Sequence, residues 1–259
     1  EDQTHTRMAY SPEDRKGREL FLSYADKMGL AHRMDEAGNL FVLLEGRYSS
    51  LPSILIGSHL DTVPDGGKYD GVLGCLAGLG VLEAYINAGE RPDHTIEAVV
   101  YTDEEGFRFG KGLLGSSVIC GINPNICEEE LDIYGESRGS VMGGFGCKIS
   151  DVMKGKRKKE SVCCALELHI EQGASLDRHK TPIGVVSSIA GVNRYEITVT
   201  GEANHAGSTA MADRKDALVA ASAFICQVPE VVSQWGNAFT VATVGTIRVT
   251  PHSVNVIPG

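Results

Sequence analysis

Apolar and polar positions along this chain form two patterns: continuous apolar runs, which are typical of buried strands, and apolar residues at helical spacing. Two segments have helical spacing: the first begins at the cap signal Ser11-Pro12 and ends near Gly29, and the second covers residues 72–88. Continuous apolar runs predict strands over residues 40–44, 54–56, 97–101, 165–168 and 183–189. Strands that alternate with helices in this order indicate an α/β sheet with a site along one edge.

The pattern changes towards the C-terminus. Residues 195–200 and 239–249 alternate between apolar and polar positions, as half-exposed antiparallel strands do. Between them, residues 213–228 carry alanines and larger apolar side chains along one stripe, which predicts a helix. This β-α-β order is the first half of a small α+β domain. We therefore expect a large first domain over residues 1–189 and a half-built second domain over residues 190–259.

The composition is that of a globular protein, with 259 residues, 42% hydrophobic residues and 31 glycines. A formal net charge of −10 argues against nucleic acid or an anionic membrane as the main partner, since either favours a basic surface. The seven cysteines are odd in number and scattered, which favours reduced thiols. The chain starts with polar residues, from Glu1 to His5, and no run approaches the roughly 18 apolar residues of a membrane-spanning helix. We therefore expect a soluble cytoplasmic protein.

Residues 121–161 form a polar, glycine-containing stretch framed by acidic residues 128–130 and basic residues 154–159. Charge runs of this kind usually lie on a solvated surface, so we expect a solvated helix–loop segment here. A specific anion site is the alternative.

Side chains that can bind metal follow the ends of the predicted strands. His59 and Asp61 come just after the strand over residues 54–56, and Asp70 lies further along the same glycine-rich loop. One ring nitrogen of His59 can bind a metal ion while a carboxylate two residues later accepts the other N–H and fixes the tautomer. Asp70 is far enough along the loop to fold back onto the same ion.

Glu104-Glu105 and His169 end two further strands. Each of these groups alone is more often a solvated loop residue, but their recurrence at strand ends favours a metal site. Two imidazoles with several carboxylates suit borderline divalent ions such as zinc, manganese, cobalt or nickel. In an adjacent pair of glutamates, one can bind metal while the other stays free as the general base that hydrolysis needs.

Six motifs follow one another in the order of a known family: Ser58-His-Leu-Asp-Thr-Val-Pro, Tyr69-Asp-Gly-Val-Leu-Gly, Thr102-Asp-Glu-Glu-Gly, Phe107-Arg-Phe-Gly, His169-Ile-Glu-Gln-Gly and Asn204-His-Ala-Gly. They resemble the M20 family of metal-dependent amidohydrolases, and more narrowly its N-carbamoyl-L-amino-acid hydrolase and allantoate amidohydrolase branch. The short spacing from His59 to Asp70 favours this branch, as does His169, where the family's peptidases present a carboxylate. The resemblance implies a mixed-sheet, zinc-peptidase-like catalytic domain and a ferredoxin-like lid and dimerisation domain.

The resemblance also implies roles for individual residues. It makes Asp70 the bridging ligand of two divalent metal ions, which are zinc or manganese, with cobalt or nickel as alternatives. The implied metal ligands are His59, Asp70, Glu105 and His169. Asp61 then orients His59, and Glu104 is the general base.

Three further residues are implied to contact the substrate, a small ureido compound: Gln172, His205 and Asn255. His205 would stabilise the developing oxyanion. In the family this histidine comes from the partner subunit, so the resemblance implies a homodimer formed through the lid domain. The residues alone leave other interpretations open, since His205 can be an ordinary loop histidine and Asn255 a turn residue.

The chain departs from the family pattern in several places. The family's fifth metal ligand, a histidine, and the arginine that holds the substrate carboxylate would both lie beyond Gly259. The usual N-terminal helix is absent, and Ala210 stands where proline is usual. We therefore expect a truncated form of a binuclear hydrolase that cleaves the ureido C–N bond of N-carbamoyl-L-amino acids or allantoate. The alternatives are an M20 aminoacylase or dipeptidase, an inactive chain that acts only in binding or dimerisation, and a fragment that folds only with help.

Overall fold

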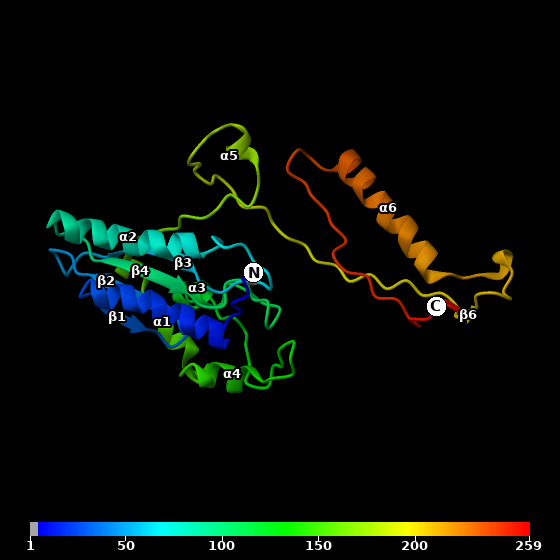
Figure 1. The fold of residues 1–259 in the computed structure, drawn as a ribbon, viewed down its shortest axis with the longest axis horizontal. Helices are drawn as coiled ribbons and strands as arrows, with labels where there is room; N and C mark the ends of the chain where they lie inside the picture. Colours follow the sequence, from blue (N-terminus) through cyan, green and yellow to red (C-terminus); the bar gives the residue numbers. More distant parts are fainter. Residues whose placement is uncertain (1–4) are drawn as a thin grey trace. The chain divides into compact units, whose positions relative to one another are not determined.

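A computed structural model describes residues 5–259 of the chain (Figure 1). The polar start over residues 1–4 lies outside the described residues. The chain forms two compact units that divide between Thr181 and Pro182, a few residues before the boundary expected at 189/190. Each unit is described by itself below.

The first unit contains a five-stranded mixed sheet with the strand order β1-β2-β4-β3-β5. Its strands are β1 (Ala31–Met34), β2 (Leu40–Leu44), β3 (Ser53–His59), β4 (Ile96–Tyr101) and β5 (Val162–Leu166). Strand β3 pairs in parallel with both β4 and β5, whereas β2 is antiparallel to β1 and β4. The carboxyl ends of β3, β4 and β5 therefore meet at one edge of the sheet, and the α/β mixed-sheet fold is confirmed.

Two long helices, α1 (Pro12–Lys27) and α2 (Val72–Ala88), share one core with the sheet (Figure 1). Helix α1 begins where the sequence predicts, because the Ser11 side chain accepts the Asp14 N–H as a helix cap. Helix α2 lies directly on β3: a Cβ added to Gly78 would come 2.6 Å from the Ile56 carbonyl oxygen. On the opposite face of the sheet, Phe41, Leu55 and Val99 form a second core cluster with Ile119.

Short helices follow β4 along the chain: α3 (Leu114–Ile119), α4 (Arg138–Gly144), η1 (Ile149–Gly155), η2 (Lys159–Ser161) and α5 (Ser175–Arg178). The segment expected to be a solvated surface contributes buried side chains, among them Val141, Met142, Cys147 and Val152. That expectation is wrong for this part of the segment, because apolar residues between the charged runs pack into a core that they share with earlier parts of the chain, such as Tyr10, Phe109 and Val118.

The second unit contains β6 (Asn204–His205), η3 (Met211–Asp213), α6 (Ala217–Trp235) and β7 (Val256–Ile257). Helix α6 begins later than predicted because Asp216 is its cap, accepting the Leu218 and Val219 N–H groups at 3.0 and 3.1 Å. Among the described residues, only the short antiparallel pair β6–β7 forms a ladder in this unit.

The strand predicted over residues 183–189 at the end of the first domain is not formed, nor are those over residues 195–200 and 239–249, so the expected ferredoxin-like lid is not confirmed. Their alternation marks a face suited to burial, but a strand also needs a neighbour that pairs with its main chain. The apolar side chains of these segments are exposed instead, as at Val185, which is 95% exposed.

Helix α6 is long and apolar enough to cross a membrane by length and composition alone. The expectation that no segment approaches that length therefore does not hold for this helix. One such helix is weak evidence for a membrane span, because a helix that packs an apolar face within a globular protein has the same composition.

Candidate metal centre

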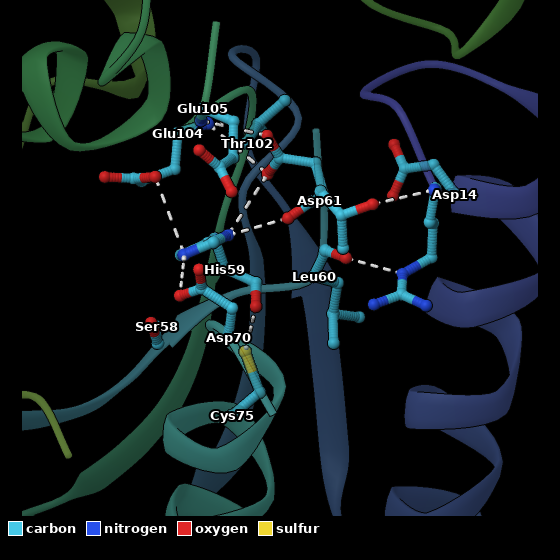
Figure 2. Close-up of polar contacts among 12 residues, drawn as sticks. Asp14, Ser58, His59, Leu60, Asp61, Asp70, Cys75, Thr102, Glu104 and Glu105 are labelled. Atoms are coloured by element: carbon cyan, nitrogen blue, oxygen red, sulfur yellow. Dashed lines mark hydrogen bonds and ion pairs between the residues drawn. The ribbon is translucent and has the colours of Figure 1, made fainter. Parts of the chain in front are cut away.

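The carboxyl ends of the three parallel strands bring the candidate ligands together (Figure 2). His59 is the last residue of β3 and lies opposite Tyr101 of β4, from which the chain continues to the two glutamates. His169 follows the end of β5, and Asp70 reaches the same place from the loop before α2. Parallel pairing is the reason that residues far apart in the sequence meet here.

Gly71 lets the Asp70 loop pass against His59. It adopts φ +66°, a left-handed conformation that favours glycine. A Cβ at this position would lie 2.4 Å from the His59 carbonyl oxygen and 2.6 Å from the imidazole atoms Cε1 and Nδ1. Any larger residue would therefore displace either the loop or the imidazole.

Main-chain geometry determines the tautomer of His59, which is 2% exposed. Its Nδ1 lies 2.8 Å from the main-chain carbonyl oxygen of Asp61 but 3.9 Å from the carboxylate Oδ1 of the same residue. A carbonyl oxygen only accepts, so Nδ1 carries the proton and donates it. The Nε2 lone pair then faces Glu104 Oε2 at 3.5 Å and Asp70 Oδ1 at 3.9 Å.

The buried Asp61 carboxylate holds the turn after β4. Its Oδ1 accepts the Glu104 N–H at 3.3 Å and its Oδ2 accepts the Glu105 N–H at 3.1 Å (Figure 2). Burial raises the pKa of Asp61, although a protonated His59 would lower it in part. Asp61 therefore orients His59 through its main chain and the two glutamates through its side chain.

The Asp70 carboxylate contacts the side chains of both His169 and Gln172. His169 donates from Nδ1 to the Ile170 carbonyl oxygen at 2.9 Å, so its Nε2 lone pair lies 3.1 Å from Asp70 Oδ1. Gln172 donates from Nε2 to the other carboxylate oxygen, Oδ2, at 3.1 Å. Among residues 5–259, no group donates a hydrogen bond to the buried Oδ1 of Asp70.

These contacts test whether a metal ion fits the residues. His59 Nε2 and His169 Nε2 lie 3.9 and 3.1 Å from Asp70 Oδ1, so three acceptors converge, and a cation among them, either a metal ion or a proton on one imidazole, relieves their repulsion. The potential ligand atoms fall into two groups, and within each group they all lie within 4.8 Å of one another. The first group is His59, Asp70 and His169, and the second is His59, Glu104 and Glu105. Imidazole nitrogen and carboxylate oxygen are donors that suit zinc, manganese, cobalt or nickel. The residues therefore fit a divalent ion.

The acidic groups beside this site titrate abnormally. Burial raises the pKa of both Glu104 and Glu105, and neighbouring carboxylates raise it further; a protonated His59 would oppose the rise in part. Burial and the charge of Asp61 likewise raise the pKa of Asp103 to about 7, although Arg138 opposes the rise. The sequence interpretation assigned no role to Asp103. The signal in the sequence that could have pointed to Asp103 was its place in the Thr102-Asp-Glu-Glu-Gly motif, directly before the two glutamates.

His205 and Asn255 lie together in the second unit. His205 pairs with Val256 across the β6–β7 ladder, and the Ala206 N–H donates to the Asn255 carbonyl oxygen at 2.9 Å. The Gly207 N–H donates to His205 Nδ1 at 3.0 Å, which leaves Nε2 of a neutral His205 as the ring's proton donor. The other predicted site residues belong to the first unit: His59, Asp61, Asp70, Glu104, Glu105, His169 and Gln172.

A mixed α/β sheet whose parallel strand ends gather imidazoles and carboxylates is an arrangement typical of metal-binding hydrolases. Residues 55–247 match the model of Peptidase family M20/M25/M40, and the chain belongs to this family. It is 39% identical over 253 residues to an N-carbamoyl-L-amino acid amidohydrolase of Geobacillus stearothermophilus, covering 98% of this chain and 61% of the relative. It is 36% identical over 255 residues to an allantoate amidohydrolase of Escherichia coli (strain K12), with the same coverage.

Solved structures agree with the sequence comparison. An amidase of the hydantoinase/carbamoylase family from Burkholderia vietnamiensis is similar with a TM-score of 0.77 and 32% identity, over 98% of this chain and 60% of the other. The chain thus spans about three fifths of the length of the curated relatives it matches. The membership predicted from the six motifs is confirmed.

Proposed function

We propose that this chain carries the metal-binding part of a hydrolase that cleaves the ureido C–N bond of N-carbamoyl-L-amino acids or allantoate. The convergence of His59 Nε2 and His169 Nε2 on Asp70 Oδ1 is the observation that carries the proposal, because one bound divalent ion would satisfy all three atoms at once. The substrate class is supported by the names of the similar proteins, which act on carbamoyl amino acids and on allantoate.

In this proposal the site holds two divalent ions, zinc or manganese, with cobalt or nickel as alternatives. The ligands are His59, Asp70, Glu105 and His169, with Asp70 bridging. Bound ions of this kind would polarise the ureido carbonyl and make water more acidic. Asp61 fixes the His59 tautomer and the direction of the two glutamates.

Glu104 is the proposed general base. Its Oε2 lies 3.5 Å from His59 Nε2, and its side chain is partly exposed, so an incoming water can reach it. Burial raises the pKa of Glu104, which makes its carboxylate a better proton acceptor near neutral pH. Glu104 would take a proton from the attacking water and pass it to the leaving nitrogen.

Three residues are proposed to contact the substrate: Gln172, His205 and Asn255. Gln172 already points an amide N–H at Asp70, so its side chain lies where a substrate amide would approach. His205 would donate from Nε2 to the developing oxyanion, in agreement with the tautomer that Gly207 imposes on it. We further propose that the second unit forms a homodimer, that the protein is cytoplasmic, and that neither nucleic acid nor membrane is a partner.

A substrate panel tests this function. The chain, or the whole protein if its gene encodes a longer one, is loaded with Mn²⁺, Zn²⁺ or Co²⁺ and given N-carbamoyl-L-amino acids, allantoate, N-acetyl amino acids and dipeptides. We expect ammonia release from a ureido compound and loss of that release in Glu104→Gln with metal content unchanged. Turnover of only acyl or peptidyl compounds would refute the ureido assignment, and near-wild-type turnover by Glu104→Gln would refute the base.

A further inference from the structure

The turn that carries Glu104 and Glu105 depends on the residue before it. Asp103 is fully buried and adopts φ +51°, a left-handed conformation that is unfavourable for most residues other than glycine and that aspartate and asparagine tolerate best. Main-chain hydrogen bonds hold the turn from α3: the Leu114 N–H donates to Asp103 O at 3.2 Å and the Leu113 N–H to Glu104 O at 2.9 Å. Such a conformation persists only where the surroundings impose it, so the contacts of the Asp103 side chain bear on the direction of both glutamates.

Arg138 of α4 makes the ion pair with that side chain. Its Nη1 lies 3.5 Å from Asp103 Oδ2, and neither side chain has exposed surface. The rest of the guanidinium is held elsewhere: Nε donates to Glu130 Oε2 at 2.7 Å, and Cζ lies 3.8 Å from the centroid of the Phe109 ring. The guanidinium is therefore held between a carboxylate and an aromatic ring, with one nitrogen directed at Asp103.

This pair is poorly suited to a purely stabilising role. Two buried charges lose their hydration, and an apolar pair of similar size often stabilises a fold as well or better. The hydrogen bonding is also incomplete, since Asp103 Oδ1 and Arg138 Nη2 are buried without a partner in the described part of the chain. The Asp103–Arg138 pair instead fixes the position of the Asp103 carboxylate at the start of the turn. Without Arg138 the Asp103 side chain would lose its ion-pair partner, and the start of the turn would be held less firmly.

We propose that Arg138 is a positioning residue for the metal centre. Through Asp103 it holds the turn so that the main-chain N–H groups of Glu104 and Glu105 reach the Asp61 carboxylate and their side chains face the metal site. The consequence for metal binding rests on the proposed function, whereas the effect on the turn does not.

Amide hydrogen exchange in the metal-free chain tests the effect on the turn. In Arg138→Met we expect the Glu104 and Glu105 amides to exchange at least about tenfold faster, because their hydrogen bonds to Asp61 open more often. Arg157→Met is the matched control, since Arg157 pairs with the buried Glu97 of strand β4, the strand that leads into the turn. It should leave those two amides unchanged. Equal exchange in wild type and Arg138→Met would overturn the proposal.

A second variant covers the case in which Arg138→Met does not fold. Asp103→Asn removes the same ion pair, and asparagine tolerates the left-handed conformation. We expect the same selective rise in exchange at Glu104 and Glu105 while the sheet amides keep their protection. If Asp103→Asn also leaves the two amides protected, the proposal is wrong.

Titration with Co²⁺ tests the consequence for the metal centre. Loss of an outer residue that orients ligands typically weakens metal binding 10- to 100-fold, so the Kd of Arg138→Met should rise by about that factor and its visible absorption bands should change. Arg157→Met should bind as wild type does. If exchange rises but Co²⁺ binds unchanged, Arg138 does not position the metal ligands. If wild type binds no Co²⁺, the proposed function fails, while the exchange result still decides the role of Arg138 in the turn.

Discussion

Replacing Gly71 by alanine should damage the metal site and the fold together. Gly71 adopts φ +66° beside Asp70, and an added Cβ would lie 2.4 Å from the His59 carbonyl oxygen and 2.6 Å from two ring atoms. Neither group can move cheaply, because the carbonyl belongs to a central strand and the imidazole is buried. The alanine methyl must therefore displace the loop that carries Asp70 or turn the His59 ring.

The magnitude has two parts. A left-handed alanine costs about 1 kcal/mol relative to glycine. Forcing buried groups apart adds typically 1–3 kcal/mol, so Gly71→Ala should lower the free energy of unfolding by about 2–4 kcal/mol. Gly89→Ala is the matched control, because Gly89 ends the same helix with φ +67° and no atom within 4 Å of its added Cβ. It should lose only about 1 kcal/mol.

Urea unfolding of the metal-free chain, followed by circular dichroism, gives the two free energies. A Co²⁺ titration then gives the metal affinity, which should fall at least tenfold in Gly71→Ala and stay unchanged in Gly89→Ala. Equal destabilisation of the two variants, with equal Co²⁺ affinity, would refute the argument that Gly71 permits the close approach of the Asp70 loop to His59.

Two further predictions concern charge. Asp70→Asn should abolish tight Co²⁺ binding yet leave the metal-free chain at least as stable in urea, because an amide N–H can satisfy a histidine lone pair where a carboxylate cannot; marked destabilisation would contradict this. Burial raises the pKa of Glu97, but hydrogen bonds and charge from Arg157, with the charge of Arg33, outweigh it and hold the pKa below its usual value. The ion pairs should therefore stabilise the fold above the usual glutamate pKa and lose that effect as pH falls through the lowered pKa. Glu97→Gln should lower the free energy of unfolding by about 3 kcal/mol at pH 7 and by progressively less at acid pH. A difference in urea midpoint between the variant and wild type that does not change with pH would refute this prediction.

Much of the first unit was predictable from local sequence. The predicted strand over residues 40–44 and the helix over residues 72–88 match β2 and α2. Helix α1 follows the cap at Ser11 because a capping side chain and the main-chain N–H it satisfies are near neighbours in the sequence. The sequence also predicted that the candidate ligand side chains lie together, since strand ends in an α/β sheet are where such side chains gather.

The second unit shows the limit of the same reasoning. Alternation predicted strands over residues 195–200 and 239–249, yet neither segment has a ladder partner among the described residues. An alternating pattern states which face of a strand suits burial, but pairing depends on another segment of chain. Local sequence cannot supply that partner.

By itself, the sequence determined the family, the main helices and most strands of the first unit, and the residue types of the candidate metal site. These follow from periodicity, caps and motif spacing, which act between residues close in the chain. Only the tertiary structure decided that Asp61 acts on His59 through its carbonyl and on the glutamates through its carboxylate. It also decided that Gly71 must be small and that Arg138 lies against Asp103. Those facts depend on close contacts between distant segments, which parallel strand pairing brings to one edge of the sheet.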